Sequence, residues 1–208
     1  MPDIPYPTAP REAIDTNPQL LVLYGQHKVG KTECVAKLPG CLTLVLRAHS
    51  ADHLSGNLMD IGTLCEAGAF GKFPADNQAA REQHICAAYL STLEDLYQRR
   101  TAGKPVADII AHDDIGIVED WVFDLALSNF LATPMGKSKL GEGLRRITDL
   151  PGQGGSPGWA YVWEEFDRMM WRIRRASPKA VVIAHMRDKV VNKETGEVSD
   201  TDLDLSGK

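Results

Sequence analysis

Residues 20–32 read LLVLYGQHKVGKT, an apolar run followed by a loop bounded by glycines. The last eight residues, Gly25 to Thr32, match the G-x-x-x-x-G-K-[ST] pattern of loops that bind phosphate. The apolar run 20–24 predicts a short buried strand, because strands of parallel sheets are covered on both faces. A helix is expected after Thr32 and should end at Pro39-Gly40. The predicted order is therefore strand, loop and helix, which this pattern requires.

Each fixed position of the loop has a physical role. Gly25 and Gly30 are expected to adopt backbone angles that a Cβ would block, so that N–H groups turn toward phosphate oxygens. Lys31 is expected to reach the β- and γ-phosphates of ATP, and the Thr32 hydroxyl to join a Mg²⁺ shell, since Mg²⁺ prefers oxygen ligands. The predicted nucleotide-binding residues are Gly25, Gln26, His27, Lys28, Val29, Gly30, Lys31, Thr32 and Glu33. A coincidental Gly-rich turn is the alternative.

Composition restricts the class of protein. The chain has 208 residues, of which 43% are hydrophobic, enough for one domain with a sizeable core. No apolar run approaches the length of a membrane span, so no membrane partner is expected. The net charge of −5 argues against a broadly basic nucleic-acid surface but allows a local basic patch. The four cysteines form no C-x-x-C pair, which predicts reduced, packed thiols in a cytoplasmic protein.

Further segments alternate along the chain. Strands are expected at 41–46, 106–111 and 180–184, helices at 76–100, 115–133 and 161–175, and a loop at 134–158, with a polar, Gly-containing stretch after Ser50 up to about Pro74. A turn at 193–197 would join a hairpin between 190–191 and 198. The alternation predicts an α/β fold, with a mostly parallel sheet, helices on both faces and a C-terminal hairpin. We expect a flexible lead over residues 1–18 and one domain over 19–208.

Three candidate functional residues follow predicted strand ends. Ligands of open parallel sheets bind beyond the carboxyl ends of the strands, so Asp113, Asp114 and His185 should share one edge with the loop. Asp113 is the predicted second metal residue beside Thr32, and Asp114 is predicted to orient water. Either aspartate could instead cap the following helix. His185 is predicted to sense the γ-phosphate or hold a water, or else to be a satisfied core histidine. Together with Lys31, these three residues form the predicted catalytic set.

Two groups of cations have separate interpretations. The first lies in the predicted Gly-rich loop 134–158 and comprises Lys137, Lys139, Arg145 and Arg146. Backbone freedom with interleaved cations suits a groove for single-stranded nucleic acid, and a mobile surface loop is the alternative. The second group comprises Arg172, Arg174, Arg175 and Lys179. There a solvated helix end, whose cations compensate the negative end of the helix dipole, is favoured over the alternative of DNA contact.

The order of these motifs resembles the short RecA-like P-loop ATPases of bacteriophages, a group that includes single-strand annealing recombinases. The resemblance covers residues 19–208 and rests on LLVLYGQHKVGKTE, ADIIAHDDIG, a long helix, AVVIAHMRDK and NKETGEVSDTDLDLSGK. It implies a three-layer, RecA-like P-loop NTPase in the cytoplasm of a host cell. It also implies that Lys31 and Thr32 bind ATP and Mg²⁺, and that Asp113 completes the metal site. By the same resemblance His185 reports on the γ-phosphate, and the loops after Asp114 and His185 face DNA.

The sequence departs from this family where a general base is expected. Many ATPases of this type place a Glu after the strand that follows the P-loop helix, whereas this chain reads Arg47-Ala48-His49-Ser50. Glu33, His49 and Asp114 are possible substitutes. This departure predicts slow hydrolysis, or hydrolysis that needs a partner subunit or DNA.

The leading functional hypothesis is a RecA-like, Mg²⁺-dependent ATPase that binds single-stranded DNA, promotes annealing or recombination, and forms homo-oligomers. One alternative is a P-loop kinase of a nucleotide or small acceptor, in which Arg145 and Arg146 would serve as a lid. Another is a nucleotide-binding interaction protein that barely hydrolyses ATP. Hydrolysis that responds to DNA would favour the first hypothesis, and phosphorylation of an added acceptor the second.

Overall fold

The structure is a computed structural model that describes residues 19–26, 28–74, 76–141, 143–150, 157–191 and 198–203. The strands are β1 (Leu20–Gly25), β2 (Cys41–Val45), β3 (Leu58–Asp60), β4 (Ile109–Asp113), β5 (Lys179–Val191) and β6 (Val198–Leu203). The helices are α1 (Lys31–Ala36), α2 (Ile61–Glu66), α3 (Gln78–Thr101), α4 (Ile115–Ala132), α5 (Pro134–Gly141) and α6 (Gly158–Ala176), with a 3-10 turn η1 at Ile147–Asp149. The predicted lead 1–18, His27 and the predicted turn 193–197 lie outside the described residues.

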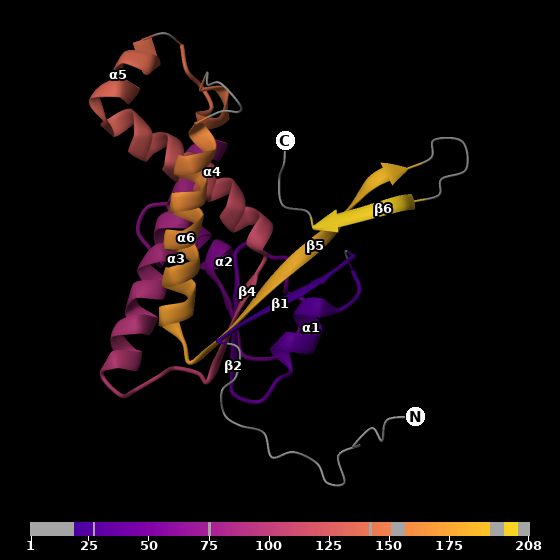
Figure 1. The fold of residues 1–208 in the computed structure, drawn as a ribbon. Helices are drawn as coiled ribbons and strands as arrows, with labels where there is room; N and C mark the ends of the chain where they lie inside the picture. The colour runs from indigo at the N-terminus through magenta and orange to yellow at the C-terminus, as the bar shows by residue number, and fades with distance from the viewer. Residues whose placement is uncertain are drawn as a thin grey trace, which may run out of the picture.

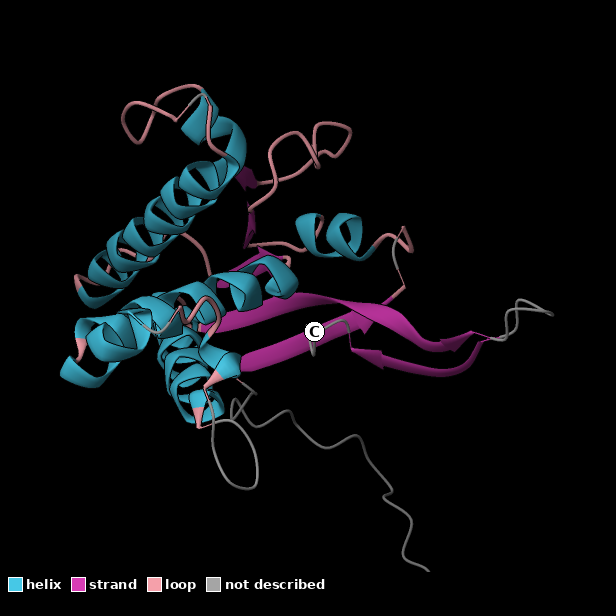
Figure 2. Ribbon diagram, turned by 90° about the horizontal axis from the view of Figure 1, so that it is seen from above, coloured by secondary structure: helices cyan, strands magenta, loops and turns pink. Residues whose placement is uncertain are grey.

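A five-stranded parallel sheet organises the chain, with the strands in the order β1-β5-β4-β2-β3 (Figure 1). One face is covered by α1 and the other by α2, α3, α4 and α6. β5 extends past the sheet and pairs in antiparallel fashion with β6 (Figure 2). The predicted α/β fold, with its mostly parallel sheet, helices on both faces and C-terminal hairpin, is confirmed. Within the described part of the chain, no helix is long and apolar enough to cross a membrane.

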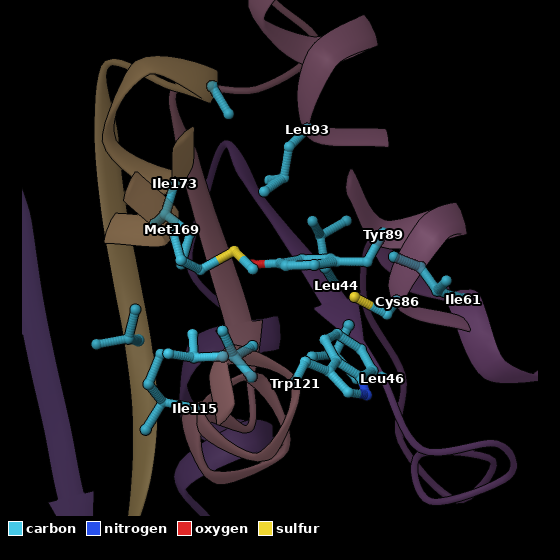
Figure 3. Packing of buried hydrophobic residues seen from close by; sticks show 14 of the residues in the cluster. Leu44, Leu46, Ile61, Cys86, Tyr89, Leu93, Ile115, Trp121, Met169 and Ile173 are labelled. Atoms are coloured by element: carbon cyan, nitrogen blue, oxygen red, sulfur yellow. The ribbon is translucent and has the colours of Figure 1, made fainter. Parts of the chain in front are cut away.

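The main core lies between the sheet and the four-helix layer. Tyr89 of α3 packs near Trp121 of α4, with ring centroids 5.7 Å apart, and Met169 of α6 faces them across the core (Figure 3). The polar residue His112 of β4 is also fully buried, and its Nδ1 lies 2.8 Å from the hydroxyl oxygen of Tyr89. The smaller core beneath α1 consists of Val35, Cys41, Ala111, Val181 and Ile183. The unequal cores show that the helical layer on one side contributes most of the buried apolar surface.

Strand β1 corrects one prediction. The run 20–24 was expected to be buried, yet Leu21, Val22 and Tyr24 are 53%, 45% and 60% exposed. The reason is position in the sheet: among the described strands β1 pairs with β5 alone, and the six residues of α1 cover little of it. An apolar run therefore predicted the strand correctly but did not reveal that it lies at the edge of the sheet.

Two segments in which no helix or strand was predicted contain regular structure. The segment 47–74 includes β3 and α2, where the Asp60 carboxylate accepts a hydrogen bond from Thr63 N at 2.8 Å and caps α2. The segment 134–158 includes α5 and η1, and Pro134 occupies the first turn of α5, where its missing N–H costs nothing. The loop prediction for 134–158 was wrong, and β3 and α2 were missed, because short helices give little periodic signal, although Asp60 and Pro134 were available as start signals. The predicted strand 106–111 is also displaced, since β4 begins at Ile109.

Gly62 of α2 holds the segment after β2 close to the helix. A Cβ at Gly62 would collide with Ala48 N and lie 2.9 Å from Ala48 Cα and 3.0 Å from Leu46 O. We expect Gly62→Ala to lower the free energy of unfolding by about 1–3 kcal/mol, because backbone atoms cannot move aside independently. Urea denaturation measures this loss. Ser91→Ala, at an exposed position of α3, should change stability by less than about 0.5 kcal/mol; equal stability of the two variants would contradict the close packing.

Candidate functional site

Residues 25–32, called the P-loop here after their sequence pattern, join the carboxyl end of β1 to the first turn of α1. Gly30 caps α1 with φ 82°, in the left-handed region that favours glycine, as expected. Gly25 does not need this freedom: it ends β1 as an ordinary strand residue, and an added Cβ would lie 3.6 Å from Val29 Cγ2. Instead Lys28 adopts a left-handed conformation, with φ 63°. The prediction for Gly25 was wrong because the bend of the loop is placed three residues later, at Lys28.

Lys31 is buried at the centre of the loop, with 8% of its surface exposed. Its Nζ donates hydrogen bonds to Gly25 O at 2.8 Å and Gln26 O at 2.7 Å, and lies 3.1 Å from His185 Nδ1. Burial lowers the pKa of Lys31, and the charges of Asp113 and Asp114 oppose that shift. The ammonium is thus held in place by loop carbonyls rather than by a carboxylate.

The orientation of His185 follows from its neighbours. The Lys31 ammonium can only donate, so Nδ1 accepts and the proton of the neutral ring lies on Nε2. That atom faces Asp114 Oδ2 at 3.8 Å. β5 brings His185 here because it lies between β1 and β4, with His185 in register with Gly25. The predicted convergence of His185 with the P-loop is therefore present in the structure.

Thr32 and Asp113 connect the P-loop to the end of β4. Thr32 Oγ1 donates a hydrogen bond to Asp113 Oδ2 at 2.7 Å, across 81 positions of sequence. Burial raises the pKa of Asp113, and the charge of Asp114 adds to this effect, while the bond from Thr32 and the charge of Lys31 oppose it. A hydroxyl and a carboxylate are hard oxygen donors, which is the chemistry that Mg²⁺ prefers. The donor atoms of this pair are therefore of the kind that could hold Mg²⁺.

The two carboxylate oxygens of Asp114 have different neighbours. Its Oδ1 accepts a hydrogen bond from Ile117 N at 2.9 Å, so the residue caps α4. Ligand atoms of Asp113, Asp114 and His185 all lie within 4.8 Å of one another. The capping alternative is therefore observed for Asp114, and one carboxylate oxygen still faces His185.

A cavity of about 300 Å³ adjoins the P-loop. It is lined by Lys28, Gly30, Lys31, Thr32, Glu33, Ser50, His53, Leu54 and His185. Sequence reasoning missed Ser50, His53 and Leu54, because the segment after β2 was treated only as the expected position of a Glu. The available signal was topological, since that segment also follows the carboxyl end of a parallel strand. Two larger cavities, of about 350 and 330 Å³, lie along α3 and α4 and are lined by no P-loop residue.

The candidate general bases have other partners. Glu33 forms an ion pair with Lys37 at 2.5 Å on the surface of α1. His49 Nδ1 lies 2.9 Å from Asp52 Oδ2, and its Nε2 lies 3.2 Å from Glu66 Oε2. Asp114 caps α4. Neither His49 nor Asp114 lines the cavity, and Glu33 does so while paired. Among the described residues, the arrangement brings Lys31, Thr32 and Asp113 together without an evident general base.

His49 connects the segment after β2, which lines the cavity, to α2 through hydrogen bonds. Hydrogen bonding to Asp52, and then to Glu66, raises the pKa of His49 above its usual 6.5. A raised pKa in the folded state gives stability that is complete below pH 6.5 and is lost as pH rises through the folded value. We therefore expect His49→Gln to destabilise the protein more at acidic than at alkaline pH. Urea denaturation on both sides of neutrality measures the difference, and a pH-independent loss would contradict the ion pairs.

The predicted nucleic-acid residues lie apart from this site. Lys137 and Lys139 are on α5, which follows the 18 residues of α4. An α-helix of that length spans about 27 Å, so α4 carries the chain far from the end of β4 before α5 begins (Figure 1). Arg145 and Arg146 line the larger 350 Å³ cavity, together with Glu82, Asp120 and Asp124. The structure does not gather these four cations around the P-loop cavity.

Comparisons with known proteins add no family assignment. No protein-family model matches the chain, and a search of curated proteins finds no match. Its class is therefore defined by the fold and the site alone: an α/β protein with a glycine-bounded loop, a buried lysine and two aspartates at the carboxyl edge of a parallel sheet.

Proposed function

We propose that the chain is a Mg²⁺-dependent, RecA-like P-loop ATPase that binds ATP in the cavity beside Lys31 and acts on single-stranded DNA in annealing or recombination. The observation that carries the nucleotide part is the 2.7 Å hydrogen bond between Thr32 and Asp113. It joins the last residue of the P-loop pattern to the strand-end carboxylate expected to share its metal ion. A chance Gly-rich turn gives no reason for this pairing.

The P-loop residues have distinct roles in this proposal. The Lys31 ammonium exchanges its bonds to Gly25 O and Gln26 O for bonds to phosphate oxygens. Thr32 and Asp113 would hold Mg²⁺, which supplies positive charge that neutralises the phosphates. His185 Nδ1, released when Lys31 moves toward phosphate, would report occupancy of the γ-phosphate position to Asp114. The contacts that this lysine now makes are therefore the ones that nucleotide binding changes.

Slow hydrolysis by the isolated chain is part of the proposal. Glu33 is paired with Lys37 through one oxygen, and both ring nitrogens of His49 have carboxylate partners, so neither side chain is held ready as a general base. Proton acceptance by a positioned base accelerates such reactions by about 10²–10⁴-fold. Turnover is expected to increase when DNA or a neighbouring subunit supplies or reorients such a group.

Assembly into homo-oligomers is supported by the edge of the sheet. β1 exposes Leu21, Val22 and Tyr24 beside backbone groups that pair on one side only among the described strands. Long apolar edges are normally covered, because they otherwise pair with other chains. The kinase alternative has less support, since Arg145 and Arg146, its proposed lid, line a different cavity from Lys31.

ATP hydrolysis measured with and without oligo(dT) tests the proposal. We expect low turnover of the chain alone, dependence on Mg²⁺, and an increase of about tenfold or more with single strands, the size of effect expected from a newly placed base. Adding nucleoside monophosphates as acceptors distinguishes the kinase, which would phosphorylate them. Absence of Mg²⁺-dependent ATP binding would overturn the nucleotide part. ATP binding without any response to DNA would leave a nucleotide-binding interaction protein instead.

A further inference from the structure

The outward face of α6 carries two exposed tryptophans. Trp163 is 62% and Trp171 is 59% exposed, whereas Val162, Met169 and Ile173 on the opposite face are buried. The two indoles are eight residues apart, or about 12 Å along the helix axis. A single exposed apolar residue needs no partner by itself, so the significance of these indoles depends on what surrounds each of them.

The ring of Trp171 contacts a guanidinium group that also contacts a second aromatic ring. The Arg175 guanidinium lies 4.2 Å from the centroid of Trp171 and 4.4 Å from that of Tyr97 on α3. The same guanidinium pairs with Glu94, which fixes its position between the two rings. Cation–π contacts of this kind orient an indole while leaving other parts of its surface open. Trp171 is therefore a rigid, exposed platform.

The surroundings of Trp171 are positively charged. The ends of α3 and α6 lie together, because Arg100 Nη1 donates hydrogen bonds to Arg175 O at 3.0 Å and Ser177 O at 2.7 Å. Residues 94–101 and 171–179 contain six cations and two carboxylates, a local excess of four positive charges in a chain of net charge −5. Arg174 bonds the amide oxygen of Gln19 at 3.3 Å. Helix-dipole compensation explains cations here, but it does not explain an exposed indole among them.

We propose that the C-terminal turns of α3 and α6 bind single-stranded nucleic acid, with a base stacked on Trp171 and phosphates near Arg174 and Lys179. Bases stack on aromatic side chains in a sequence-tolerant way, and nearby cations neutralise the backbone. The inference deepens the proposed function by giving its single-stranded partner a position, and it rests on that part alone. A partner protein with an apolar surface fits less well, because charged side chains surround the indole.

The surface lies opposite the nucleotide site. α6 ends at Ala176 and β5 begins at Lys179, while α3 ends before β4, so both helices end at the amino edge of the sheet. The P-loop, Asp113 and His185 lie at the carboxyl edge. This position also differs from the loops after Asp114 and His185. Oligonucleotide binding at this surface requires no bound ATP.

Fluorescence anisotropy of labelled oligo(dT), titrated with the full chain without nucleotide, tests the proposal. Trp171→Ala is expected to weaken binding by about tenfold or more, and Trp171→Phe, which keeps an aromatic face, by about threefold or less. Arg174→Gln should weaken binding and make the slope of log affinity against log salt concentration about 0.7 less steep. Trp163→Ala is the matched control, because this residue is equally exposed on the same helix but has no Arg175 stack; its affinity should stay within about twofold.

Three results would overturn the proposal. The first is unchanged affinity in Trp171→Ala, the second is an equal loss in Trp163→Ala, and the third is absence of binding by the intact chain. Self-association that depends on Trp171, with no oligonucleotide binding, would identify the surface as a protein contact and also contradict the proposal. Thermal melting shows whether each variant is folded. Lys31→Ala separates the two proposals, since it should lose ATP binding and keep oligonucleotide binding.

Discussion

Lys31→Ala is expected to abolish Mg²⁺–ATP hydrolysis, with a loss of about 10²–10³-fold or more in kcat. The reason is that the Lys31 ammonium is buried and is already held in position by hydrogen bonds to Gly25 O and Gln26 O. No described cation in the cavity other than Lys28 is available to replace it, and Lys28 is not buried. Initial rates of phosphate release measure the loss of turnover, and calorimetric titration with ATP measures the loss of ATP binding.

Lys28→Ala provides the control for this prediction. Lys28 lines the same cavity, but its backbone stands at φ 63° and its side chain is exposed, so its contribution to phosphate binding should be smaller. We expect Lys28→Ala to retain most of the activity. Turnover of Lys31→Ala close to that of the unmodified chain would show that the cavity is not the site of hydrolysis.

Asp113→Asn is expected to remove the Mg²⁺ dependence of ATP binding and to lower turnover by about 10²-fold or more, an effect comparable with loss of another charge-stabilising group. Asparagine keeps an oxygen that can accept the Thr32 hydrogen bond, but it removes the charge that attracts the metal ion. Because burial raises the pKa of Asp113, its charged form is disfavoured in the folded protein. The free energy of unfolding at neutral pH should therefore stay equal or rise, while activity falls.

Asp114→Asn distinguishes the two adjacent aspartates. Asparagine is an effective helix N-cap, so the hydrogen bond to Ile117 N should survive and stability should change little. Asp114→Ala removes that cap and should lower the free energy of unfolding by about 1 kcal/mol. Magnesium titrations of ATP binding, combined with urea denaturation, measure both properties. If Asp114→Asn abolished the Mg²⁺ dependence and Asp113→Asn did not, the metal role would belong to Asp114.

The candidate site was largely predictable because parallel strands bring their carboxyl ends to one edge. The apolar runs before Gly25, Asp113 and His185 were each recognisable, so their end residues could be expected together, and the structure confirms this. The contacts of the candidate general bases were not predictable. His49 and Glu33 are engaged through contacts with Asp52, Glu66 and Lys37 that depend on how loops and helices fold around the edge.

The sequence by itself determined the order of the longer strands and helices, the glycine-bounded loop pattern and the polar residues that follow strand ends, because these depend on local periodicity and on the spacing of neighbouring residues. Only the tertiary structure decided that β1 lies at an edge, that Arg145 and Arg146 line a cavity together with carboxylates, and that the exposed Trp171 contacts Arg175. The same apolar sequence can form a central strand or an edge strand of a sheet. Likewise, the sequence does not show whether a cation will lie beside phosphate or beside carboxylate. The difference lies in neighbours that are distant in the chain, and the packing of the whole domain determines those neighbours.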